Sequence, residues 1–106
     1  MCKYMFQAKY TAEGAKGLVS EGGSARRAAV EKAMAGVGGR LESFYFAFGN
    51  TDAYVVADLP DNASAAAVAL AVAQSGRAAV TTIVLMTTAE ADEAVKKVVA
   101  YRPPGG

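Results

Sequence analysis

The amino-acid sequence predicts an α+β fold on the β-α-β-β-α-β plan, with an added helix at the C-terminal end. Three observations predict it. Residues 4–11 alternate apolar and polar side chains, as a strand with two unlike faces does. Residues 49–52 form a turn signal between two apolar, strand-like segments. The motif Leu59-Pro60-Asp61 then combines a strand end, a stop signal and a helix cap.

The first half of the plan starts with that alternating strand, which places on one face the side chains of Tyr4, Phe6, Ala8 and Tyr10. Residues 12–23 contain four glycines, and no helix or strand is expected there. Ser24 is the expected N-cap of a helix that runs to about Val37, after which Gly38 and Gly39 let the chain turn. The inward stripe of this helix is Val30, Ala33, Met34 and Val37. On its solvent side, Arg27 and Glu31 have the spacing of an ion pair.

The centre of the chain is an expected antiparallel hairpin. Residues 41–48 are rich in aromatic side chains, and residues 53–59 are rich in valine and alanine. The turn of residues 49–52 reverses the first segment into the second. Strict alternation along the first segment would place Leu41 and Tyr45 opposite Phe44, Phe46 and Phe48.

The second half repeats the strand and helix signals. A helix is expected from about Ala63 to Ser75 and Gly76, followed by a strand over residues 78–86. Thr87 and Glu90 have capping-box spacing, which predicts a last amphipathic helix through Ala94, Val95, Val98 and Val99. Residues 1–102 are therefore expected to form a single domain of the ferredoxin-like type, and residues 103–106 a mobile tail.

The strands are apolar on both faces, which bears on assembly. In this plan both main helices cover one face of the sheet, so the other face needs a polar surface or a cover. Leaving large apolar side chains in water would forgo about 1.5–3 kcal/mol each. We therefore expect a homodimer, or a larger assembly of such dimers, packed sheet face to sheet face. The alternative is that the C-terminal helix folds back over the open face of a monomer.

Composition excludes several classes of function. Eleven basic and ten acidic residues leave a net charge of +1, so neither nucleic acid nor an acidic membrane is an expected partner. Cys2 is the only cysteine and the chain has no histidine, so no disulfide, zinc site, haem or other cofactor is expected. The strand-like N-terminus leaves no room for a signal peptide, and no apolar run is long enough to span a bilayer. A cytoplasmic location is expected.

Three segments together carry a family resemblance: the strand of residues 4–11, the turn Gly39-Arg40-Leu41, and the spacing of Gly49 and Asp52 before a valine-rich strand and Leu59-Pro60-Asp61. They resemble the GYD domain family of small bacterial proteins. The tyrosine that gives the family its name is Thr51 in this chain. The family is similar to the dimeric α/β-barrel proteins, in which two ferredoxin-like subunits pair through their sheets. The resemblance thus implies this fold and a dimer, but no particular chemistry.

The candidate site residues lie in and near the hairpin. Asp52 could act as a general base if an apolar surface raised its pKa, or its carboxylate could cap the turn by accepting backbone N–H groups. Four further candidates could line a cavity between two sheets, and these are Tyr4, Arg40, Tyr45 and Tyr54. Glycines before Arg26 and Arg27 are explained by a helix cap, with an anion site as the weaker alternative.

Two functions remain open from the sequence. The first is a dimeric binding or regulatory module that takes a small apolar or aromatic ligand without chemistry. The second is a cofactor-independent enzyme, such as an isomerase, a dehydratase or a monooxygenase, that uses Asp52 as its base in an inter-sheet cavity. The absence of histidine and tryptophan favours binding over catalysis.

Overall fold

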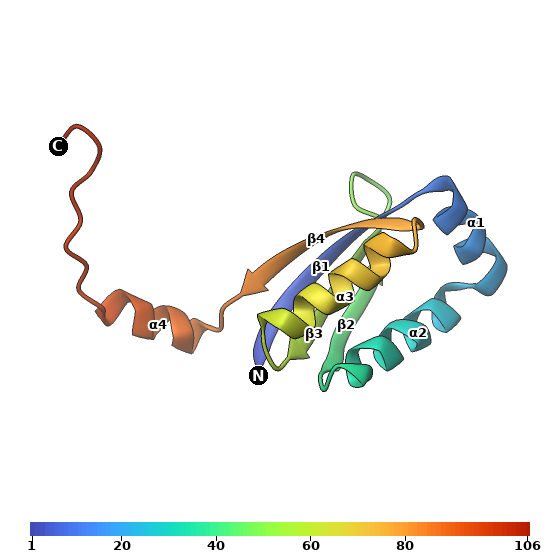
Figure 1. Cartoon of the computed structure of the whole chain (residues 1–106), viewed down its shortest axis with the longest axis horizontal. Helices are drawn as coiled ribbons and strands as arrows, with labels where there is room; N and C mark the ends of the chain where they lie inside the picture. Colours follow the sequence, from blue (N-terminus) through green and yellow to red (C-terminus); the bar gives the residue numbers. More distant parts are fainter.

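A four-stranded antiparallel sheet in the order β2-β3-β1-β4 is the centre of the molecule. The computed structural model describes residues 1–106. The strands are β1 (Cys2–Tyr10), β2 (Arg40–Phe46), β3 (Ala53–Leu59) and β4 (Ala78–Leu85). The helices are α1 (Ala12–Glu21), α2 (Gly23–Gly36), α3 (Asn62–Gln74) and α4 (Thr88–Lys96). The predicted α+β fold with a ferredoxin-like pattern is confirmed (Figure 1).

The core lies between one face of the sheet and the helices α2 and α3. The cross-strand register brings Phe6 and Phe44 beside Val55 on this face. Met34 of α2 and Val68 of α3 pack against them from above and are buried. Side chains of this size stabilise the folded chain by about 1.5–3 kcal/mol each when removed from water. The opposite sheet face, called here the open face, has no helix against it.

The segment before α2 folds differently from the expectation. Residues 12–21 form the helix α1, because Thr11 acts as its N-cap and accepts a hydrogen bond of 3.2 Å from the backbone N–H of Gly14. Gly14 is needed for packing, since a Cβ atom there would overlap the backbone carbonyl of Arg77. The N-cap of α2 is Gly22, at φ +85°, and not Ser24.

The hairpin of β2 and β3 is confirmed, with one irregularity. The register pairs Leu41 with Ala57 and Ser43 with Val56, so Glu42 is the extra residue of a β-bulge. The bulge breaks the alternation along β2. Leu41 therefore packs against the core on the same face as Phe44, where strict alternation had placed it on the opposite face.

The caps of the two later helices follow the sequence signals. Asp61 caps α3 by accepting a hydrogen bond of 2.8 Å from the backbone N–H of Ser64. Thr87 and Glu90 form the expected capping box at the start of α4. However, α4 ends at Lys96 and Lys97 is extended, so Val98 and Val99 lie beyond the helix and not in it.

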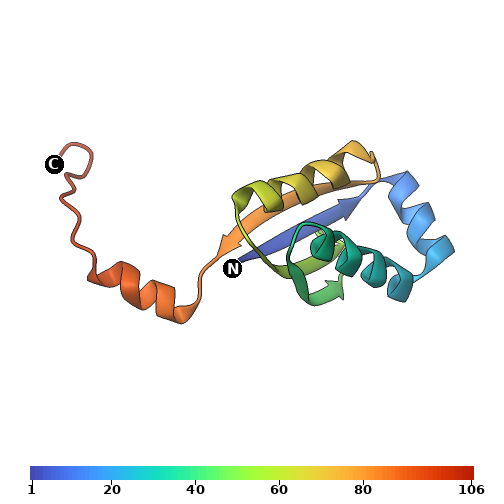
Figure 2. The same cartoon turned by 60° about the horizontal axis from the view of Figure 1, so that its bottom comes forward.

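The last helix stands away from the rest of the molecule. In both views α4 and the residues after it extend outward from the end of β4 (Figures 1 and 2). Val95, the only valine of this helix, is 84% exposed, and Val98 and Val99 after the helix are exposed as well. The alternative in which this helix covers the open face is therefore not the arrangement that the structure has. None of the helices combines the length and apolarity needed to cross a membrane.

Candidate functional site

A cavity of about 440 Å³ lies between the helical face of the sheet and the helices α1, α2 and α3. It exists because many of the residues that surround it have short side chains. On the sheet these are Ala8, Ala53 and Ala78, and on the helices they include Gly17, Ala33 and Ala71. Interiors are otherwise packed nearly as densely as organic crystals, so a space of this size is an unusual feature for a chain of this length.

Most of the cavity surface is apolar. Phe6, Phe44 and Val55 form part of its floor, while Met34 and Val68 border it from the two main helices. All five side chains also belong to the buried core. The cavity is thus continuous with the core, and an apolar molecule inside it would contact the same surface that stabilises the fold.

The charged side chains of the cavity lie near Tyr10, whose hydroxyl is influenced by Arg26 and Glu21. Tyr10 ends β1 and pairs with Ala78 at the start of β4, directly after Arg77. Glu21 and Arg26 come from the junction of α1 and α2, and the Nε atom of Arg26 lies 3.3 Å from Oε1 of Glu21. One end of the cavity is therefore polar and carries two arginines and one glutamate.

Tyr10 contributes a hydroxyl to this end. Burial raises its pKa above the ordinary value, and the carboxylates of Asp52 and Glu21 add to the increase, while the positive charge of Arg26 opposes it. The phenol is therefore neutral at physiological pH. It can act as a hydrogen-bond donor but not as a base.

Asp52 lies outside this cavity and binds a neighbouring strand. Its Oδ2 atom accepts a hydrogen bond of 2.8 Å from the backbone N–H of Tyr10, and its Oδ1 atom lies 3.3 Å from Nζ of Lys9. The carboxylate thus caps a backbone group of β1, rather than N–H groups of its own turn as the sequence pattern predicts. These contacts, led by the Tyr10 bond, lower the pKa of Asp52, which is opposite to the shift that a general base needs.

The predicted tyrosines lie on two different faces. Tyr4 is buried in the core at 1% exposure, and its hydroxyl donates a hydrogen bond of 2.5 Å to Oδ1 of Asn62. It borders a second, shallower groove between α3 and β4. Tyr45 and Tyr54 are cross-strand partners on the open face, at 71% and 38% exposure. The structure therefore does not bring these tyrosines together around one space.

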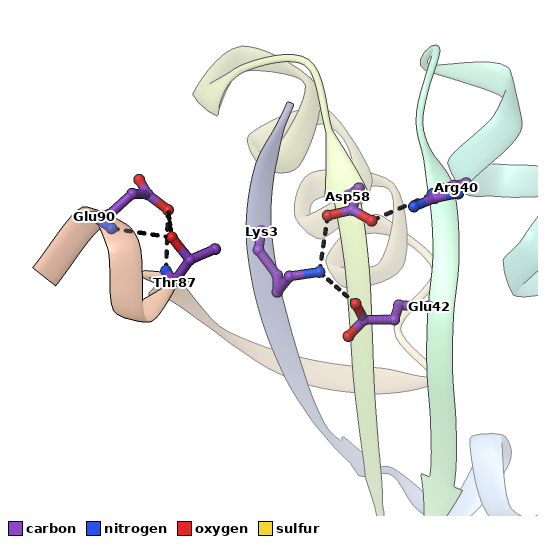
Figure 3. Close-up of polar contacts among 6 residues, drawn as sticks. All are labelled: Lys3, Arg40, Glu42, Asp58, Thr87 and Glu90. Atoms are coloured by element: carbon purple, nitrogen blue, oxygen red, sulfur yellow. Dashed lines mark hydrogen bonds and ion pairs between the residues drawn. The ribbon is translucent and has the colours of Figure 1, made fainter. Parts of the chain in front are cut away.

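Arg40 belongs to a charge cluster on the open face. Its Nε atom lies 3.3 Å from Oδ2 of Asp58, and Oδ1 of Asp58 accepts a hydrogen bond of 3.0 Å from Nζ of Lys3 (Figure 3). Lys3 also bonds Glu42, the bulge residue. The Lys3 ammonium, followed by Arg40, lowers the pKa of the nearly buried Asp58. The two positive and two negative charges of this cluster balance one another, although Arg40 contacts Asp58 through Nε alone and its side chain is largely exposed.

The cavity was missed in the sequence because no local pattern encodes it. Its short side chains are spread over residues 8–78 and meet only in the folded chain. The one available signal was the high alanine content of residues 63–73, which leaves only alanine and valine side chains of these residues at the cavity. The structure also contains no cluster of three or more aspartate, glutamate or cysteine side chains that could hold a metal ion.

A comparison with protein families gives the decisive match. The family model of the GYD domain matches residues 4–95, which run from β1 to α4. The chain belongs to the GYD domain family. All the residues that line the cavity fall within the GYD domain. Comparisons with the curated proteins and with the solved structures give no match.

Proposed function

We propose that this GYD domain binds a small, mainly apolar or aromatic molecule in the cavity between its sheet and its helices. The observation that carries the proposal is the cavity itself. Its volume of about 440 Å³ falls in the range of roughly 300–1,000 Å³ that is usual for small-molecule sites. Its apolar floor and its few polar groups at one end also fit such a site.

The energetics of packing support a binding role. The cavity opens to solvent, since Ala33, Ala67 and Ala71 are exposed, so apolar side chains beside it lack protein contacts and meet water, which lowers the stability of the fold. Larger side chains at Ala33, Ala67 or Ala71 would fill part of this space. A ligand that occupies the cavity restores those contacts, and its binding free energy adds to the stability of the folded chain.

Binding is favoured over catalysis. The catalytic alternative depends on Asp52 as a base, but this carboxylate lies outside the cavity lining and its neighbours hold it ionised. The titratable groups inside the cavity lining are Tyr10, Glu21, Arg26 and Arg77. Tyr10 is protonated because burial raises its pKa, the arginines offer only N–H donors, and the Glu21 carboxylate is paired with Arg26. These groups suit recognition of a ligand better than proton abstraction.

We further propose that two copies pair through the open face of the sheet. The support is apolar surface in the middle of that face, where Met5, Val56 and Ile83 lie in neighbouring strands. Tyr45 and Tyr54 extend this surface toward the β2 edge. Covering such side chains with a second copy would contribute to association through the hydrophobic effect. Ligand binding on the other face could then regulate the dimer through the shared sheet.

A cavity-filling variant tests the binding proposal. Ala71→Leu places a larger side chain at the cavity, whereas Ala73→Leu makes the same change on α3 outside the cavity lining. Binding of Nile red, a neutral apolar dye, is measured by fluorescence titration. We expect Ala71→Leu to weaken binding by about tenfold and Ala73→Leu to leave it unchanged. Absence of saturable dye binding by the parent, or equal effects of both variants, would contradict the proposal.

A further inference from the structure

The charged end of the cavity points to a more specific ligand. Resting on the proposed function, we infer that the ligand is an apolar monocarboxylate, with its hydrocarbon body over the cavity floor and its carboxylate between Arg26 and Arg77. The inference depends on three features of this end: the balance of charge, an unsatisfied arginine nitrogen, and an arginine without an ion-pair partner.

The balance of charge favours one anionic group. The charged residues that line the cavity are Glu21, Arg26 and Arg77, which together carry one excess positive charge. Glu21 is the only acidic side chain among them, and it lies beside Arg26. Arg77 makes no ion pair within the chain, although its backbone carbonyl accepts a hydrogen bond of 2.9 Å from Thr11. A single carboxylate would neutralise this excess charge.

The Nε atom of Arg26 is buried and has no hydrogen-bond partner. It lies 3.3 Å from Oε1 of Glu21, but the two atoms do not make a hydrogen bond. A buried N–H group without an acceptor is costly, and native proteins seldom leave one unsatisfied. A guanidinium group presents its N–H donors in a plane that matches a carboxylate, so a ligand carboxylate could supply the missing acceptor.

The surroundings of the two arginines exclude a more highly charged ligand. The rest of the cavity is mainly apolar and offers no further cation, so a dianion would keep one negative charge unpaired near a low-dielectric surface. The hydroxyl of Tyr10 is the neutral donor at this end and can add a hydrogen bond to the same carboxylate. A molecule with an apolar body and one acid group therefore fits both parts of the cavity.

A matched pair of probes tests the inference on the unmodified chain. Decanoate and decanol have the same hydrocarbon length and differ in charge at pH 7.5. Their affinities are measured by displacement of Nile red, below the concentration at which decanoate forms micelles. We expect the parent to bind decanoate about tenfold more tightly than decanol, and we expect this preference to decrease as salt is added.

Variants at the polar end of the cavity test which arginines cause the preference for decanoate over decanol. Arg26→Gln and Arg77→Gln each remove one positive charge at the cavity, and Arg27→Gln is the matched control. Arg27 is a neighbour of Arg26 on α2, but it pairs with Glu31 at 3.2 Å on the solvent side. We expect the first two variants to lose most of the preference for decanoate while binding decanol as the parent does. The control should keep the full preference.

The outcomes separate this inference from the proposed function. Binding of decanol and decanoate with equal affinity by the parent would overturn the inference and leave the cavity as a site for neutral ligands. An equal loss of preference in Arg27→Gln would also overturn it, because general surface charge would then explain the effect. If the parent binds neither the dye nor either probe, the proposed function itself is wrong. If a variant fails to fold, the comparison of decanoate with decanol on the parent still tests the inference.

Discussion

Asp52 joins the hairpin turn to the end of β1 through two backbone contacts with that strand. Its Oδ2 atom accepts a hydrogen bond of 2.8 Å from the backbone N–H of Tyr10. Its own backbone N–H donates a hydrogen bond of 2.8 Å to the carbonyl of Ala8. Tyr10 also borders the polar end of the cavity. The carboxylate therefore holds in place a strand end that contributes to the candidate site.

Two substitutions of Asp52 separate the role of its oxygen from that of its charge. Asp52→Asn keeps an oxygen that can accept the Tyr10 hydrogen bond but loses the attraction to Lys9, an exposed pair of small value. Asp52→Ala loses both. We expect the free energy of unfolding, measured with urea, to decrease more for the alanine variant. Equal decreases would show that the charge matters and the hydrogen bond does not.

Stability should be flat near neutral pH and should decrease toward both extremes. The pKa values of Asp52 and Asp58 are lowered in the folded chain by hydrogen bonds from Tyr10 and Lys3 respectively. Their contribution is complete above the ordinary aspartate value of 3.8 and is lost as the pH falls through the folded value. Histidine is the side chain whose ordinary pKa lies near neutral pH, and the chain has none. Stability is therefore expected to stay constant in that range.

At high pH, the free energy of unfolding should decrease as the pH rises. Hydrogen bonds to Glu42 and Asp58 raise the pKa of Lys3, and burial raises the pKa of Tyr10. Their contributions are complete below the ordinary values of 10.5 and 10.0 and are lost as the pH rises through the folded values. Urea midpoints across the pH range measure both limbs. Asp58→Asn should flatten the acid limb, and an unchanged acid limb would contradict this assignment.

Two glycines of α1 should respond in opposite directions to the same substitution. A Cβ atom at Gly14 would overlap the backbone carbonyl of Arg77, which cannot rotate away. Gly14→Ala should therefore lower the free energy of unfolding by about 1–3 kcal/mol. The nearest atom to a Cβ at Gly17 is Nη1 of Arg77 at 4.0 Å, so Gly17→Ala should stabilise the helix by up to about 1 kcal/mol. Equal effects in urea unfolding would contradict this account of α1.

The proposed dimer depends on the open face. Tyr45 and Tyr101 have nearly equal exposure, at 71% and 72%, but only Tyr45 lies on that face. Light scattering at micromolar concentration should give a multiple of the 10.9 kDa chain for the parent and for Tyr101→Asp. Tyr45→Asp should shift the mass toward a single chain, because a carboxylate would be buried without a partner. A parent mass of 10.9 kDa would show that the open face stays free.

The elements that the sequence predicts well are those with local signals. The turn of residues 49–52, the cap at Asp61 and the capping box of Thr87 and Glu90 depend on residues close together in the chain. Each of these has its expected structural outcome. Arg27 and Glu31 likewise form their expected pair, since that contact lies within one helix.

Features that depend on distant residues were missed. A glycine at position 14 predicts a break in a helix, but its missing side chain allows contact with Arg77, which is far away in the sequence. The bulge at Glu42 moved Leu41 to the core, and only the pairing with β3 fixes its position. The candidate site was affected in the same way. The hairpin residues are polar or aromatic side chains that can be recognised one at a time in the sequence. The cavity is formed by small side chains from several elements that have no common pattern.

The outward position of α4 has a consequence for how the molecule unfolds. This helix has nine residues, and isolated helices shorter than about 12–15 residues are only marginally stable in water. Its capping box supports the first turn, but the views of the molecule place the helix clear of the sheet (Figures 1 and 2). Backbone amides of α4 should therefore exchange with deuterium far sooner than those of β1, which has a strand on each side. The helical signal in circular dichroism should begin to decline before the sheet melts.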